Sequence, residues 1–184
     1  MNLANQLTLL RIVFIPLFVV VFYLPFSWAH FLCAIVFSVA AITDWLDGYV
    51  ARKYNQTTSF GAFLDPVADK LMVAFALLLL VSIHSDSAWF VVAAAVIVGR
   101  EIVISALREW MAELGQRASI AVSYIGKIKT TLQMVAIIVL LMDIKALNLI
   151  GFIALGGAAF LTLWSMILYL RVASPFLLAD SAKK

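Results

Sequence analysis

Long apolar stretches separated by short polar turns run through most of this chain. Residues 12–43 contain no Asp, Glu, Lys or Arg, but Pro25 and Ser27 interrupt the run. A membrane-spanning helix needs about 20 mostly apolar residues, so this run predicts two helices joined by a turn. The same reasoning along the whole chain predicts six spanning helices, at about residues 7–25, 28–51, 59–84, 88–111, 120–142 and 146–171.

The composition supports a lipid environment for these helices. Of the 184 residues, 65% are hydrophobic, and the mean hydropathy is +1.09. A soluble domain has roughly 45–50% apolar residues. Neither a tandem repeat nor a linker marks a second domain, so we expect residues 1–184 to form a single integral-membrane domain of the all-α class.

The lysines and arginines indicate the orientation of the chain. Six spans put both termini on one side, and Lys145 alone falls on the opposite side, which leaves twelve of the 13 basic residues with the termini. Positively charged loops remain in the cytoplasm. Both termini are therefore expected to be cytoplasmic.

Several charged residues fall inside the predicted helices, nearly all in the halves nearest the cytoplasm. Such groups are costly in lipid unless they pair or face a wet cavity. The sequence therefore predicts a polar cavity that opens to the cytoplasm and is surrounded by the six helices. The residues concerned are Asp44, Asp47, Asp65, Asp69, Lys70, Arg100, Glu101, Lys127 and Lys129.

Four of these residues are aspartates on two consecutive helices. Asp44 and Asp47 are three residues apart, and Asp65 and Asp69 are four apart, so each pair shares one helix face. Pro66 is expected to disturb regular helix at Asp65. Carboxylates held this close repel one another unless hard divalent cations bind them, and two such cations are the usual arrangement for handling phosphates. A cation or proton transporter and a membrane prenyltransferase remain alternatives at this point.

The spacing of the aspartates resembles the signature of the CDP-alcohol phosphotransferase family. All eight fixed positions of Asp44-x2-Asp47-Gly48-x2-Ala51-Arg52-x8-Gly61-x3-Asp65-x3-Asp69 are filled. Residues 5–11, 100–109 and 126–130 also resemble the bacterial members that use glycerol 3-phosphate as acceptor. The resemblance covers most of residues 4–134.

This resemblance implies a membrane enzyme of phospholipid synthesis. It would transfer the phosphatidyl group of CDP-diacylglycerol to sn-glycerol 3-phosphate and release CMP, with two divalent cations, Mg²⁺ or Mn²⁺, as cofactors. The resemblance further implies a homodimer in the bacterial inner membrane, with a cytoplasmic active site and no nucleic-acid partner. Serine, inositol phosphate and phosphatidylglycerol remain alternative acceptors.

The resemblance also assigns roles to residues. The metal ligands would be Asp44, Asp47, Asp65 and Asp69, and Asp69 would also be the general base. Contacts to CDP-diacylglycerol would come from Asn5, Thr8, Gly48, Ala51, Arg52, Thr58 and Gly61.

An acceptor that carries a phosphate needs further cations, and the later helices offer four. Arginine can grip a phosphate with two parallel hydrogen bonds. We therefore expect Arg100, Arg108, Lys127 and Lys129 to bind glycerol 3-phosphate. Because Lys127 and Lys129 are two residues apart, a regular helix does not aim both the same way, so one is expected to meet substrate and the other lipid headgroups.

Overall fold

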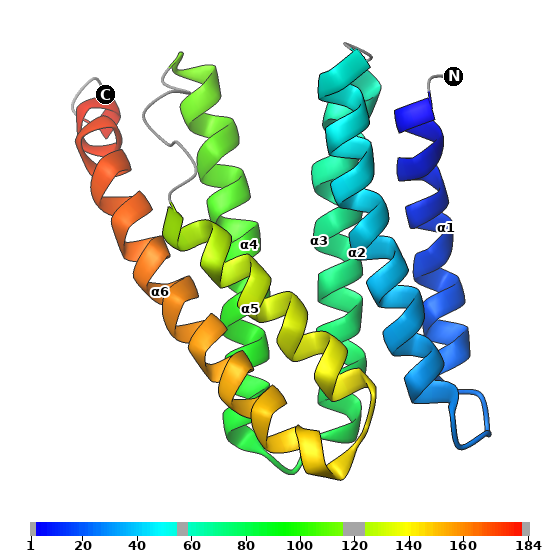
Figure 1. Cartoon of the computed structure of the whole chain (residues 1–184). Coiled ribbons are helices and arrows are strands. Elements are labelled where there is room, and N and C mark those ends of the chain that lie inside the picture. Colours follow the sequence, from blue (N-terminus) through cyan, green and yellow to red (C-terminus); the bar gives the residue numbers. More distant parts are fainter. Residues whose placement is uncertain (1–2, 55–58, 116–123, 182–184) are drawn as a thin grey trace. The chain divides into compact units, whose positions relative to one another are not determined.

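Six α-helices make up the described part of the chain in a computed structural model (Figure 1). The structure describes residues 3–54, 59–115 and 124–181, without the side chains of residues 3–8, 44–54, 59–63, 65, 124–125, 127 and 177–181. The expected all-α class with six helices is confirmed, and no strand occurs in these ranges. The helices are α1 Leu3–Phe22, α2 Ala29–Tyr54, α3 Ser59–Ile83, α4 Ala88–Glu113, α5 Tyr124–Leu141 and α6 Lys145–Ser181.

Within the described residues, three helices are long and apolar enough to cross a membrane. The qualifying segments are Pro66–Ile83 of α3, Ala88–Glu113 of α4 and Lys145–Phe176 of α6. The other three helices carry shorter apolar segments, Leu9–Phe22, Ala29–Thr43 and Ile128–Leu141. These bounds cover only the residues whose side chains the structure describes, and the count of six spans stays a prediction.

Prolines shape the helices differently from the expectation. The first helix ends at Phe22 rather than at residue 25, and Pro25 lies in the turn that follows. The expected disturbance at Pro66 was wrong, because α3 remains α-helical on both sides of it. Likewise α6 continues through Pro175 to Ser181, beyond the expected end at residue 171. A proline inside a helix removes only one backbone hydrogen bond. Ending the helix there would leave several more backbone groups unpaired in lipid, which is costlier, so α3 and α6 continue through their prolines.

The chain forms two compact units, of which the first comprises residues Met1–Ser85 and Ile137–Gly151. In this unit α1 packs against both α2 and α3, and α2 packs against α3 (Figure 1). The fully buried rings of Phe18 and Phe37 lie 6.3 Å apart, and the Phe22 and His30 rings lie 4.7 Å apart. These pairs show that α1 and α2 run antiparallel.

Two chain turns meet at one end of the first unit. His30 Nδ1, just after the α1–α2 turn, lies 3.5 Å from Asp143 Oδ2 in the α5–α6 turn. Asp143 has a φ of 51°, in the left-handed region that aspartate tolerates better than most residues. Both turns were expected on the side of the membrane away from the termini. Their contact agrees with this expectation, in which successive helices cross the membrane in opposite directions.

The second unit comprises residues Asp86–Ala136 and Phe152–Lys184. Near their N-terminal ends, α4 and α6 bring the Phe90 and Phe152 rings to 5.6 Å. Further along both helices, Ile104 of α4 and Tyr169 of α6 share a buried cluster. The two helices therefore run parallel, which places arginines of α4 beside polar residues of α6.

Glycines of α6 let neighbouring helices approach closely, as in many membrane proteins. A Cβ added at Gly156 would lie 2.8 Å from the Trp89 ring, and one at Gly157 would lie 2.9 Å from the Leu132 side chain. Within the first unit, a Cβ at Gly151 would lie 2.6 Å from Leu140. Small residues are therefore required where α6 passes α4 and α5.

Candidate functional site

The first unit carries all four aspartates. Asp44 and Asp47 lie on α2, Asp65 and Asp69 lie on α3, and both pairs sit in continuous helix, so each pair shares a face. The side chains of Asp44, Asp47 and Asp65 lie outside the described residues, and Asp69 is half-buried. Among the side chains that the structure describes, no group of three or more His, Cys, Asp or Glu could hold a metal ion.

Four carboxylates nevertheless fit the chemistry of the expected cations. Carboxylate oxygens are the ligands that Mg²⁺ and Mn²⁺ prefer. In this chain they come from two helices that pack against each other and are joined by a short connection. The metal site itself stays a prediction.

The residues expected to contact CDP-diacylglycerol, apart from Thr58, lie on α1 and on the two helices that carry the aspartates. Their side chains lie outside the described residues, so their contacts also remain predictions. Asn5 and Thr8 are on α1, Gly48, Ala51 and Arg52 are on α2, Gly61 is on α3, and Thr58 falls in an undescribed range.

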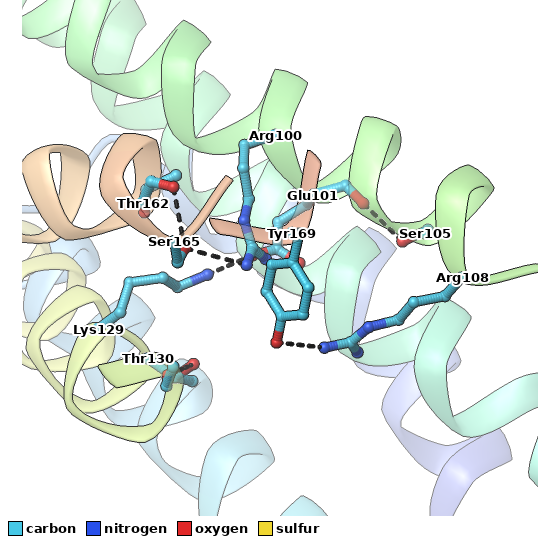
Figure 2. A network of polar contacts seen from close by, with 10 residues as sticks. Arg100, Glu101, Ser105, Arg108, Lys129, Thr130, Thr162, Ser165 and Tyr169 are labelled. Carbon is cyan, nitrogen blue, oxygen red and sulfur yellow. Dashed lines mark hydrogen bonds and ion pairs between the residues drawn. The ribbon is translucent and has the colours of Figure 1, made fainter. Parts of the chain in front are cut away.

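The second unit contains a network of cations, shown in Figure 2. Arg100 donates from Nη1 to Glu101 Oε1 at 3.2 Å and from Nη2 to Ser165 Oγ at 3.1 Å. Lys129 Nζ donates to the same Glu101 oxygen. Arg100 and Lys129 are only 7% and 3% exposed. A single carboxylate therefore serves an arginine of α4 and a lysine of α5.

Arg108 joins this network through Tyr169. Its Nη2 donates to the tyrosine hydroxyl at 3.0 Å, and its guanidinium carbon lies 5.3 Å from the ring centroid. The guanidinium carbon of Arg100 lies 5.5 Å from the same centroid. Figure 2 shows the Tyr169 ring between the two arginines. Both distances are in the range of a cation–π interaction.

The network is rich in positive charge and leaves donors unused. Arg108 has no carboxylate partner among the described residues. Within the same part of the chain, Arg100 Nε is buried without a hydrogen-bond partner. A buried unpaired donor is costly, and guanidinium groups match anions with several oxygens. The arrangement is suited to binding such an anion.

Three of the four predicted acceptor-binding residues meet in this one network, namely Arg100, Arg108 and Lys129. Lys129 is buried and donates to Glu101 within the second unit, and its expected contact with the substrate stays a prediction. The side chain of Lys127 lies outside the described residues.

Sequence reasoning missed the contribution of α6 to the network. Thr162, Ser165 and Tyr169 are all buried, at 0%, 1% and 6% exposure. Their spacing of three and four residues puts them on one face of an otherwise apolar helix. This polar stripe inside a membrane helix was a signal that could have identified them.

Comparisons with known proteins agree with the residue patterns. The sequence matches the CDP-alcohol phosphatidyltransferase family over residues 1–168. It is 57% identical over 176 residues to a Sodalis glossinidius protein named CDP-diacylglycerol–glycerol-3-phosphate 3-phosphatidyltransferase, covering 94% of this chain and 95% of that one. Proteins of the same name from Salmonella typhimurium and Shigella flexneri are 57% and 55% identical over 94% and 96% of this chain, and 94% and 97% of theirs. The chain belongs to the CDP-alcohol phosphatidyltransferase family.

Proposed function

We propose that this protein transfers the phosphatidyl group of CDP-diacylglycerol to sn-glycerol 3-phosphate, giving phosphatidylglycerophosphate and CMP. The name shared by relatives that are 55–57% identical over nearly the whole chain supports this reaction. The observation that carries the choice of acceptor is the cation network of α4, α5 and α6, because it suits a substrate with a phosphate of its own.

Electrostatics favours a charged acceptor over a neutral one. Free glycerol, which has no anionic group, would leave Arg108 without an anion and the Arg100 Nε unpaired, and serine offers only the two oxygens of one carboxylate. A buried donor left unpaired, such as Arg100 Nε, costs about 1–3 kcal/mol, whereas Arg108 is exposed and its guanidinium is open to solvation by water. A phosphate monoester offers three oxygens and up to two negative charges, so it can accept from both guanidinium groups at once.

The aspartates of the first unit are assigned to the donor substrate. Members of this family generally use divalent metal ions, and we assign two, Mg²⁺ or Mn²⁺, to Asp44, Asp47, Asp65 and Asp69. Bound there, the cations would offset the negative charge of the diphosphate and of the departing CMP. Asn5, Thr8, Gly48, Ala51, Arg52, Thr58 and Gly61 would contact the rest of the CDP-diacylglycerol headgroup.

The chemical step is a displacement at phosphorus. The primary hydroxyl oxygen of glycerol 3-phosphate forms a bond to the phosphorus that carries diacylglycerol, and the bond from this phosphorus to the bridging oxygen breaks, releasing CMP. The hydroxyl proton passes to the carboxylate of Asp69, which acts as general base. The cations of the network bind the phosphate of the acceptor, which is at the opposite end of the molecule from the reacting hydroxyl. These cations are Arg100, Arg108 and Lys129.

The membrane setting of this reaction is also part of the proposal. The apolar helices and the bacterial relatives support a membrane protein. We place it in the inner membrane, with six spans, a polar cavity open to the cytoplasm and both termini cytoplasmic, because twelve of the 13 basic residues fall on that side. We further propose one domain per chain and a homodimer.

A panel of acceptors tests the proposed function. Purified protein is mixed with CDP-diacylglycerol and Mg²⁺, and CMP release is measured after adding glycerol 3-phosphate, serine, inositol phosphate or phosphatidylglycerol. Glycerol 3-phosphate should support the fastest release, and the lipid product should carry two phosphates. Faster release with serine would overturn the acceptor assignment, and no release with any acceptor would favour a transporter.

A further inference from the structure

Two residues of α6 hold the two arginines of α4 without neutralising them. Ser165 Oγ accepts from Arg100 at 3.1 Å, and the Tyr169 hydroxyl accepts from Arg108 at 3.0 Å. Ser165 and Tyr169 are four residues apart, on one face of the helix. Both acceptors are neutral oxygens, so these two contacts fix the orientation of the guanidinium groups without adding negative charge to that of Glu101, which pairs with Arg100.

Tyr169 has the larger part in this arrangement because it contacts both arginines. Its ring lies 5.5 Å from the guanidinium carbon of Arg100 and 5.3 Å from that of Arg108. Two like charges beside one ring repel each other, whereas each is attracted to the ring face. The tyrosine is itself 6% exposed and is fixed by packing against Ile104 and Met111. A rigid ring therefore determines where two mutually repelling cations stand.

We propose that Tyr169 is a positioning residue for the acceptor, which sets the separation and orientation of Arg100 and Arg108 for the two-pronged binding of its phosphate. This inference rests on the proposed function, in which the two arginines bind glycerol 3-phosphate. Tyr169 does not touch the acceptor in this scheme. It acts through the arginines, chiefly through the hydrogen bond from Arg108, and fixed geometry matters because two-pronged binding tolerates little misalignment.

Replacement by phenylalanine separates this role from simple packing. Tyr169→Phe retains the ring and the packing against the buried cluster but removes the hydroxyl that Arg108 uses. Losing a hydrogen bond to a charged group should raise the KM for glycerol 3-phosphate about tenfold. The KM for CDP-diacylglycerol and the thermal midpoint should hardly change. Tyr23→Phe is the matched control, because Tyr23 is 67% exposed and lies in the α1–α2 turn.

A double-mutant cycle tests whether Tyr169 acts through Arg108. Tyr169→Phe, Arg108→Ala and the double variant are compared with the parent in kcat/KM for glycerol 3-phosphate. If the hydroxyl works only by orienting Arg108, adding Tyr169→Phe to Arg108→Ala should change kcat/KM less than twofold. An undiminished tenfold effect in that background would overturn the proposal, as would an unchanged KM in Tyr169→Phe alone.

Two further measurements complete this test. Tyr169→Leu removes the ring as well, so it should raise the KM for glycerol 3-phosphate more than Tyr169→Phe does. A Tyr169→Leu variant that remains folded and binds the acceptor like the parent would contradict the positioning role. The parent enzyme is measured with glycerol 3-phosphate in the same experiment. A parent that releases no CMP overturns the proposed function itself, whereas an active parent with a normal Tyr169→Phe variant overturns only the role of Tyr169.

Discussion

Replacing Arg100 with alanine should separate acceptor binding from folding. Arg100 is 7% exposed, and its described partners are Glu101, Ser165 and the Tyr169 ring. Two of these partners keep other contacts when the guanidinium is removed. Glu101 remains paired with Lys129, and Ser165 still donates to the Thr162 carbonyl at 2.9 Å. The substitution therefore leaves neither a buried unpaired carboxylate nor an unpaired hydroxyl.

The expected loss of activity is large. Truncating one partner of a buried, charged hydrogen-bonded pair costs about 2–5 kcal/mol, and each 1.36 kcal/mol is a factor of ten in rate. Arg100→Ala should thus lower kcat/KM for glycerol 3-phosphate by about 30-fold to several thousand-fold. The loss of stability should be small by comparison, because Arg100 already has a buried Nε without a partner in the described chain, and burying a charge is itself costly.

The assay measures CMP release over a range of glycerol 3-phosphate at saturating CDP-diacylglycerol, beside the thermal midpoint in detergent. Arg171→Ala removes the same charge from an exposed position on α6 and serves as the control. It should change kcat/KM by less than threefold. The reasoning fails if Arg100→Ala stays within threefold of the parent, or if its main effect is on the KM for CDP-diacylglycerol.

Three other predictions concern the metals, the helix packing and the topology. Excess chelator should abolish CMP release, and added Mg²⁺ or Mn²⁺ should restore it; full activity in chelator would rule out the carboxylate metal site. Gly151→Ala should lower stability by about 1–3 kcal/mol, because the new Cβ would lie 2.6 Å from a fully buried leucine, whereas Gly99→Ala meets nothing within 4 Å and should be neutral or stabilising in a thermal melt. With Cys33 replaced by serine, an impermeant thiol reagent should label a cysteine at Ser85 from outside and one at Asn55 only after permeabilisation; the reverse pattern would invert the topology.

The helices could be predicted from the sequence because lipid imposes a simple rule on them. Every backbone group in the hydrocarbon must be paired within its own helix, so apolar stretches and the turns between them predicted six helices, although only three are long and apolar enough to span within the described residues. The ends were less predictable. Pro66 and Pro175 are signals for helix ends in water, yet α3 and α6 continue through them. The expected end of the last helix at residue 171 was also too early, because α6 continues to Ser181.

The site was partly predictable for a different reason. Arg100, Arg108 and Lys129 stand out because charges are rare in such helices, and they do meet in one network. Ser165 and Tyr169 are common in membrane helices and carry no charge, so composition did not single them out. Their role depends on the parallel packing of α4 and α6, which brings together residues more than 60 positions apart in the chain.

An arginine without a carboxylate partner has a consequence for the energetics of substrate uptake. The charge of the exposed Arg108 attracts small anions from the surrounding solution between turnovers, since no carboxylate of the described chain pairs with it. Acceptor binding is then an ion exchange, in which glycerol 3-phosphate displaces a resident counterion. The apparent affinity becomes a ratio of two affinities, so it depends on which other anions share the compartment. Sulfate and inorganic phosphate compete most strongly with glycerol 3-phosphate, because their oxygens have the same arrangement around the central atom and accept from the same guanidinium N–H groups.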